Sequence, residues 1–316
     1  MFRRLRLLLH SIQQWLPFSA TRKNRELEIL ESEKSQPVRL ALLARAQRSG
    51  HRPKHHHKSR DWSAAATADL EVLITAFQYR QFLPKAVQSA TTALHHFMEN
   101  GGRGGIAVIE DCGRDGSWAW LQEHLQRSDV PMRILQPREN IGLAAARNLV
   151  LKTTSAKTLF VLDADNEVDP TGLTALHHHL SVHPAVAAYG QLRVMNTNGE
   201  HIRDLSGEPP NREFLLTKGN HIDAMALYST EALREAGGWD VELLSAGWGL
   251  EDYALWIHWL VEDKLPAFLP EYVGNYLAKS DSMSNAYNPI TEQQVYHYLR
   301  QKYGPQVQVG LNQHGG

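Results

Sequence analysis

The sequence predicts an α/β fold in which a mostly parallel central sheet is covered by helices on both faces. From residue 70 onward, short apolar runs alternate with helix-length segments, the order expected of strands joined by crossover helices. Residues 159–162 are a clear example of a buried-strand pattern. Polar residues follow each apolar run, and in sheets of this kind ligands bind beyond the carboxyl ends of the strands.

The expected elements follow one another along the body of the chain. Strands are predicted at residues 71–77, 106–110, 132–135 and 158–162, and helices at 83–98, 115–126 and 143–152. Pro84 suits the first turn of its helix, because that turn leaves its backbone donors unpaired. The glycine-rich segment 101–105 precedes a strand, whereas a dinucleotide-binding loop follows one, so this segment is interpreted as a turn.

The composition indicates a globular body preceded by a basic arm. The 316 residues, 42% of them hydrophobic, suffice for one large α/β domain or two small ones. Residues 1–60 hold 14 Lys and Arg against 4 Asp and Glu, whereas the remainder holds 19 against 30. The single cysteine, Cys112, excludes an intramolecular disulfide and a cysteine-based zinc site, which suits a reducing cytoplasm. No apolar run reaches the roughly 18 residues that span a bilayer.

Residues 2–18 form an amphipathic basic pattern, which either lies in a membrane interface or docks on the chain's own body or a partner. They begin like a signal peptide, but Arg6 and His10 interrupt the apolar core, so secretion is not expected. Residues 24–48 continue with helical patterning, and 49–68 are interpreted as a polar linker. The predicted division is an arm and linker (1–68), a main domain (69–288, with halves 69–168 and 169–288) and a C-terminal helix and tail (289–316).

Asp163 and Asp165 directly follow the fourth predicted strand. In an extended segment, residues two apart point to the same side, so both carboxylates can face one ligand. Two such charges are costly side by side unless positive charge lies between them. A hard divalent cation completed by substrate phosphate oxygens fits this arrangement. The alternative is that Asp163 ends the strand, while Asp165 or Asp169 caps a helix beginning near Pro170.

The other three predicted strands also end in polar residues. Thr75 lies at the end of the first strand, Glu110 and Asp111 at the end of the second, and the stretch 140–148 follows the third. Each place alone has ordinary loop composition. Four such places in the topological order of a parallel sheet predict a shared ligand site.

These places resemble the inverting nucleotide-sugar glycosyltransferases of the GT-A fold, in particular family 2, over about residues 70–284. The resemblance implies that Thr75 lines the base pocket and that Asp111 binds the uracil and ribose of the donor. It also implies that Asp163 contacts the ribose and the metal shell, while Asp165 ligates a divalent cation, Mn²⁺ or Mg²⁺, on the diphosphate.

A segment in the second half, GWGLEDYAL at 247–255, is similar to the GWGGED segment of β-1,4-galactosyltransferases and related N-acetylgalactosaminyltransferases. The resemblance implies that Asp252 is the catalytic base, that Glu251 binds hydroxyls of acceptor or donor, and that Trp248 stacks on a sugar ring. The alternative is that both acids simply favour the N-terminal dipole of the following helix. A packing role is expected for Trp239.

The family stretch N-x-G-x-x-x-A-R-N adds donor-side residues and two departures. It is matched by Asn140, Gly142, Ala146, Arg147 and Asn148, of which Asn140 and Arg147 are expected to bind donor. Cys112 is inserted where the family has Asp-Gly-Ser, so the local turn must differ. Lys279 occupies a position where the family has histidine, and a lysine can neutralise phosphate but cannot ligate a cation while protonated. His221 is a further candidate for contact with the acceptor.

The resemblance thus implies a cytoplasmic enzyme that moves sugar from a UDP-sugar to a glycan or glycolipid hydroxyl. If residues 2–18 lie in a membrane interface, the enzyme is peripheral at the inner face of the membrane. No nucleic-acid partner is expected. A sugar nucleotidyltransferase is a rival, although residues 75–82 lack the glycine-rich basic segment that would hold a triphosphate. A non-catalytic sugar-nucleotide or glycan-binding subunit is another, although Asp163, Asp165 and Asp252 together argue against it.

Overall fold

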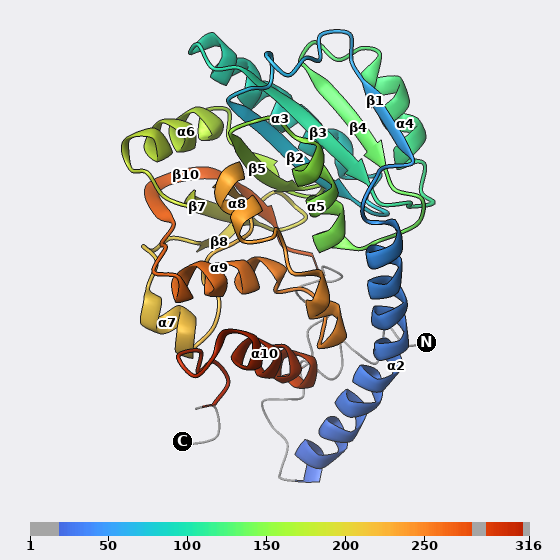
Figure 1. Cartoon of the computed structure of the whole chain (residues 1–316), viewed down its shortest axis with the longest axis vertical. Coiled ribbons are helices and arrows are strands. Elements are labelled where there is room, and N and C mark those ends of the chain that lie inside the picture. Colours follow the sequence, from blue (N-terminus) through green and yellow to red (C-terminus); the bar gives the residue numbers. More distant parts are fainter. Residues whose placement is uncertain (1–18, 280–288, 312–316) are drawn as a thin grey trace.

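The chain folds around one mixed β-sheet with helices packed on both faces (Figure 1). The computed structural model describes residues 19–279 and 289–311. In these residues the sheet has ten strands, nine of which follow the order β1-β4-β3-β2-β5-β9-β7-β10-β6, while β8 pairs with β7. Successive side chains of a strand point to opposite faces. Leu73 accordingly joins one apolar cluster, and its neighbours Val72 and Ile74 join the other.

Four parallel strands form the first half of the sheet. They are β2 (Leu70–Ala76), β3 (Gly104–Glu110), β4 (Met132–Gln136) and β5 (Thr158–Asp163). β2 lies between β3 and β5, and β4 pairs with the other side of β3. Every residue of β2 and β3 is buried, which explains why their sequences are almost entirely apolar. The four strands predicted from the sequence are confirmed.

The helices of this half cover both faces of the parallel strands. They are α3 (Leu83–Glu99), α4 (Ser117–Leu125), α5 (Leu143–Thr153) and α6 (Gly172–Val182). α5 contributes to the same apolar cluster as Leu73, whereas α3 and α6 contribute to the cluster that contains Val72. The helices predicted at 83–98, 115–126 and 143–152 are therefore confirmed to within two residues at each end.

The second half of the sheet is not all parallel. Its strands are β6 (Glu167–Val168), β7 (Ala187–Met195), β8 (His201–Leu205), β9 (Ala226–Ser229) and β10 (Ala267–Leu277). β9 runs antiparallel to both β5 and β7, while β10 is parallel to β7. Between them lie α7 (Arg212–Thr217), α8 (Thr230–Glu235), the 3-10 helix η1 (Val241–Ser245) and α9 (Glu251–Val261). The sheet is parallel in its first half and mixed as a whole.

The helix predicted at 24–48 is part of α2 (Ser19–Ser49), whose C-terminal end packs on the body. Leu42 and Leu43 of α2 are buried, and Arg48 forms an ion pair with Glu139 at 2.7 Å. The interpretation of 49–68 as a linker throughout is wrong, because β1 (His55–Lys58) pairs antiparallel with β4. This pairing covers backbone groups that β4 would otherwise expose at the edge of the sheet.

The two ends of the chain are described only in part. Residues 2–18 lie outside the described residues, so their expected contact with a membrane stays a prediction. Along the described residues, no helix combines the length and apolar character needed to cross a bilayer. Near the C-terminus, α10 (Pro289–Tyr303) packs against α2 and α9, so the first and last helices of the described residues lie next to each other (Figure 1).

Candidate active site

Parallel pairing brings the ends of β2 and β5 together. Thr75 and Asp163 are direct partners across these strands, and the Thr75 hydroxyl donates a hydrogen bond to Asp163 Oδ1 at 3.1 Å. The Asp163 side chain remains 36% exposed, so this carboxylate can still be reached by a ligand. The sequence prediction that polar residues gather at this edge of the sheet is confirmed for these two side chains.

Arg147 of α5 joins this strand end to the start of α9. Its side chain is 1% exposed, Nη2 donates to Asp163 Oδ1 at 2.9 Å, and Nη1 donates to Glu251 Oε1 at 2.7 Å. Burial disfavours its charge, but Asp163 and Glu251 outweigh that cost and raise the pKa of Arg147. We call Thr75, Arg147, Asp163 and Glu251 the arginine cluster. It unites the predicted donor side with the predicted acceptor side.

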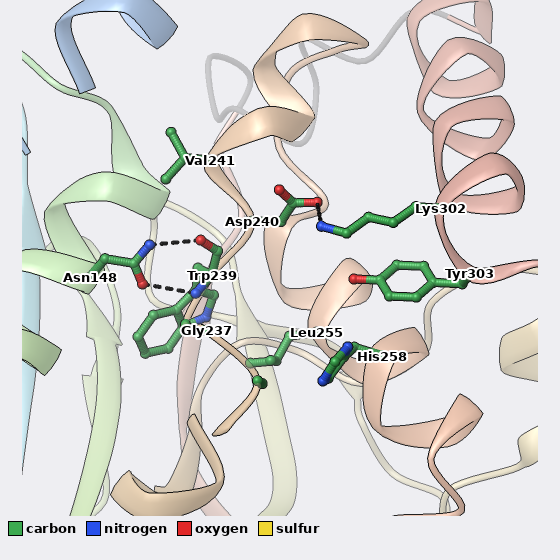
Figure 2. Close-up of a pocket in the computed structure, with 11 residues that line it drawn as sticks. Asn148, Gly237, Trp239, Asp240, Val241, Leu255, His258, Lys302 and Tyr303 are labelled. Atoms are coloured by element: carbon green, nitrogen blue, oxygen red, sulfur yellow. Dashed lines mark hydrogen bonds and ion pairs between the residues drawn. The ribbon is translucent and has the colours of Figure 1, made fainter. Parts of the chain in front are cut away.

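The residue after Arg147 fixes the neighbouring turn. Asn148 Nδ2 donates to Trp239 O at 2.7 Å, and Trp239 N donates to Asn148 Oδ1 at 2.8 Å (Figure 2). Gly238 has a φ of 83°, and a Cβ there would lie 2.2 Å from Asn148 Oδ1, so only glycine fits this turn. Trp239 is buried and lies edge-on to Tyr228, which confirms its expected packing role.

Asp252 occupies the first turn of α9, beside Glu251. Its Oδ2 accepts a hydrogen bond from Asn220 Nδ2 at 3.1 Å. Burial, followed by the nearby charges of Glu251 and Asp223, raises the pKa of Asp252 to about 8. A carboxylate with such proton affinity is suited to accept a proton near neutral pH. Glu251 and Asp252 can therefore favour the N-terminal dipole of α9 and also take part in the chemistry.

Asp223 was not selected by the sequence analysis. It lies in the turn before β9, where its Oδ1 accepts a hydrogen bond from Met225 N at 2.9 Å and its N–H donates to Ser206 Oγ. Burial raises the pKa of Asp223 to about 6, and Asp163 and Asp252 are both within electrostatic reach. Aspartate is common in polar turns, so the sequence around Asp223 gives no indication that it lies near Asp163 and Asp252.

Asp165 and Lys279 form a close ion pair. Lys279 Nζ lies 2.5 Å from Asp165 Oδ2, and it sits over the rings of Tyr79 and Phe82 at 4.0 and 4.4 Å. Burial and the charge of Asp163 raise the pKa of Asp165, against the opposing effect of Lys279. For Lys279, burial lowers the pKa but contact with Asp165 raises it more, so its ammonium stays charged.

The expectation that Asp163 and Asp165 hold Mn²⁺ or Mg²⁺ stays a prediction. Each carboxylate already contacts a cation of the chain, Arg147 or Lys279. Among the residues that the structure describes, no three His, Cys, Asp or Glu side chains are placed to share one metal ion. These two carboxylates fit a divalent cation poorly, because such an ion would have to approach the positive charges of Arg147 and Lys279 that already contact them.

The alternative is confirmed in that Asp163 ends β5, but it is wrong in that neither Asp165 nor Asp169 caps the next helix with its side chain. α6 begins at Gly172 with Thr171 at its N-cap position. Asp165 contacts Lys279, and Asp169 accepts two contacts from Arg193 Nη1 at 2.8 and 3.1 Å.

Asp111 is engaged by the protein itself. Its carboxylate accepts hydrogen bonds from Asn140 Nδ2, Ile141 N and Gly142 N at 2.7 to 2.8 Å, and burial raises its pKa to about 7. A carboxylate offers about four acceptor positions. Asp111 therefore shapes the loop before α5, and the contacts of Asp111 and Asn140 with donor stay predictions. Cys112 has a φ of 60°, in the left-handed region, and the expected difference of this turn from that of the family stays a prediction.

Two further residues, Trp248 and His221, are candidates for contact with the acceptor. Trp248 is partly exposed in the loop between η1 and α9. The ring of His221 packs edge-on against Phe214, and its Nε2 lies 3.4 Å from Pro209 O. Its neighbour Asn220, instead of His221, contacts Asp252. Acceptor contacts of Trp248 and His221 stay predictions.

A cavity of about 310 Å³ lies farther along α9, next to the turn that Asn148 fixes (Figure 2). Asp240 and Lys302 form an ion pair at 2.8 Å beside it. It is lined by Asn148, Ala236, Gly237, Gly238, Trp239, Asp240, Val241, Leu255, His258, Lys302 and Tyr303. Neither Asp163 nor Asp252 lines this cavity, so it is separate from the arginine cluster.

The family of this protein follows from its similarity to a known family model. The family model described as "Glycosyl transferase family 2" matches residues 71–237, which is more than half of the chain. The chain belongs to glycosyl transferase family 2. The matched segment contains Thr75, Arg147 and Asp163 but ends before the 247–255 segment, so the likeness of that segment to galactosyltransferases stays a prediction. No curated protein sequence matches the chain.

Solved structures support the GT-A fold of this family member. Residues 1–349 of S. aureus TarS superpose with a TM-score of 0.55 at 14% identity, over 74% of this chain and 65% of that one. The same fragment in complex with UDP-GlcNAc gives a TM-score of 0.58 at 13% identity, over 74% and 66%. Its complex with UDP gives 0.53 at 13% identity, over 72% and 64%. This chain thus spans slightly less than two thirds of the TarS fragments that it matches.

Proposed function

We propose that the protein transfers a sugar from a nucleotide diphosphate sugar, most simply a UDP-sugar, to a hydroxyl group of a glycan or glycolipid. Membership of family 2 supports the reaction class, and the TarS fragment with the same fold has been solved with UDP and UDP-GlcNAc. The observation that carries the proposal is the bridge through Arg147, which holds Asp163 and Glu251 within 2.9 Å of one guanidinium.

In this proposal Asp252 removes the proton from the acceptor hydroxyl. A sugar hydroxyl is a weak nucleophile until a positioned base takes its proton. The oxygen then attacks the anomeric carbon from the side opposite the nucleoside diphosphate, which departs with the bonding electron pair, and the anomeric configuration is inverted. The proton affinity of Asp252, raised by burial and by Glu251, suits this step.

The remaining side chains divide between the two substrates. Thr75, Asp163 and Arg147 line the donor side, where the fixed charge of Arg147 keeps Asp163 in place. Glu251 and Trp248 face the acceptor in the proposal, because a carboxylate accepts sugar hydroxyls and an indole covers the apolar face of a sugar ring. If residues 2–18 lie on a membrane, a lipid-linked acceptor follows.

Release of UDP from a panel of UDP-sugars, measured with and without added glycans, tests the proposal. We expect release with at least one donor, and loss of release in Asp252→Asn. Asp263→Asn is the matched control, since Asp263 is 85% exposed beyond the end of α9. Release that is equal in wild type and Asp252→Asn would overturn the site assignment. Binding of UDP-sugars without release or transfer under any condition would favour a non-catalytic binding subunit.

A further inference from the structure

Lys279 lies two residues after the end of β10, far in sequence from the acid that it contacts. Two backbone groups just before it are anchored, since Leu277 N donates to Asn166 Oδ1 at 3.0 Å and Ala278 N donates to Met195 O at 2.8 Å. Asn166 itself follows Asp165 in the chain. These two hydrogen bonds fix the backbone just before Lys279 and place its side chain beside Asp165.

The surroundings of the Lys279 ammonium are those of a fixed cation site. The residue is 8% exposed, and a lysine is rarely so buried unless its charge is paired. Asp165 supplies the opposite charge, while the faces of Tyr79 and Phe82 supply the negative side of their ring quadrupoles. Carboxylate and two aromatic rings together stabilise one positive charge at the carboxyl ends of β2 and β5.

A divalent cation on Asp165 would have to share this space. Lys279 Nζ lies 2.5 Å from Oδ2, so the ammonium covers one ligating oxygen and repels a second positive charge nearby. On the other acid, Arg147 Nη2 lies 2.9 Å from Asp163 Oδ1. Each carboxylate of the pair therefore contacts a cationic side chain of this protein before any donor arrives, and Arg147 shares its charge between Asp163 and Glu251.

We propose that Lys279 takes the place of the divalent cation, so that this protein binds its nucleoside diphosphate donor without a divalent metal. The ammonium of Lys279, a point charge suited to phosphate, then contacts the diphosphate from beside Asp165, in the place that a divalent cation would otherwise take. The identity of the donor rests on the function proposed above. The replacement of a metal ion by Lys279 rests on the contacts of Asp165 and is tested separately.

The first measurement is calorimetric binding of UDP to the full chain in EDTA and in Mn²⁺. We expect wild-type affinity to differ by less than about twofold between the two, whereas Lys279→Ala loses at least about tenfold in EDTA and regains part of it with Mn²⁺. Lys279→Arg keeps the charge and should keep binding in EDTA, which separates loss of charge from misfolding. Lys85→Ala is the matched control, since Lys85 also pairs with an acid, Glu167, but is 76% exposed.

The second measurement needs no donor. Free Mn²⁺ is titrated with protein and followed by electron paramagnetic resonance, because bound Mn²⁺ loses its sharp signal. We expect Lys279→Ala to bind Mn²⁺ at least about tenfold more tightly than wild type. Equal Mn²⁺ affinity in the two proteins, or wild-type UDP binding that is tenfold tighter with Mn²⁺, would overturn the inference. Absence of UDP binding under all conditions would instead refute the proposed donor, and the Mn²⁺ titration would still decide the role of Lys279.

Discussion

Two groups of acids at the same edge of the sheet are held in different ways. Asp163 and Asp165 each contact a cation, Arg147 or Lys279. Asp252 is contacted by the neutral amide of Asn220, and burial with a neighbouring acid raises its pKa to about 8. Burial raises the pKa of Asp165 as well, but contact with Lys279 opposes that rise, whereas the three largest effects on Asp252 all favour its protonated form. An aspartate is thereby suited to bind a cationic group at positions 163 and 165, and to take up a proton at position 252.

Asp252→Asn should have the largest effect on this comparison. The amide keeps the shape of the side chain but cannot accept the proton, so we expect kcat to fall by about a thousandfold, within the usual range for a general base. UDP binding should stay within about twofold of wild type, because the donor-side acids are untouched. Steady-state kinetics and calorimetry measure the two quantities. A similar loss of UDP affinity would indicate that Asp252 contributes to donor binding together with Asp163 and Asp165.

Arg147→Met should show that the arginine cluster depends on its cation. Removing the guanidinium leaves Glu251 buried without its partner, and we expect the free energy of unfolding in urea to fall by about 3 kcal/mol. Arg103→Met is the control, since Arg103 also pairs with an Asp, at 2.9 Å, but is exposed. Its unfolding midpoint should hardly change. Equal free energies of unfolding for the two variants would contradict the stabilising role of Arg147.

The rate should depend on pH through the ionisation of Asp252. Asp252 acts only when unprotonated, and its pKa is raised to about 8, so kcat/KM should rise about tenfold per pH unit below that value and level off above it. The folded state also favours protonated Asp252 more than the unfolded chain does. Its contribution to stability therefore declines as pH rises from about 4 to about 8. A flat profile from pH 6 to 9 would exclude Asp252 as the titrating base.

Asn220→Ala should have the smallest effect and the most specific one. The Asn220 amide donates to Asp252 Oδ2 at 3.1 Å and so favours the ionised form. Without it, the pKa of Asp252 should rise further and kcat/KM at pH 7 should fall about fivefold, the value of one ordinary hydrogen bond. At pH 9 the rate should approach that of wild type. Asn196→Ala, in an exposed turn with a similar contact to Glu200, should leave the profile unchanged.

Several parts of the site could be predicted from the sequence because their signals are local. Apolar runs identify buried strands, and the polar residues directly after them, such as Thr75 and Asp163, are placed at the carboxyl edge by the parallel topology alone. By contrast, β1 could not be predicted from the sequence, because HHHK has the polar composition of a loop. It becomes a strand by pairing with β4.

The sequence by itself determined the order of strands and helices, the α/β class, and which acids stand at strand and helix ends, since each follows from neighbours within a few residues. Only the tertiary structure decided that Arg147 bridges Asp163 and Glu251, that Lys279 covers Asp165, and that Asn220 and Asp223 adjoin Asp252. These contacts join segments distant in the chain. The proton affinity of each acid depends on burial and on those distant charges, which no local pattern encodes.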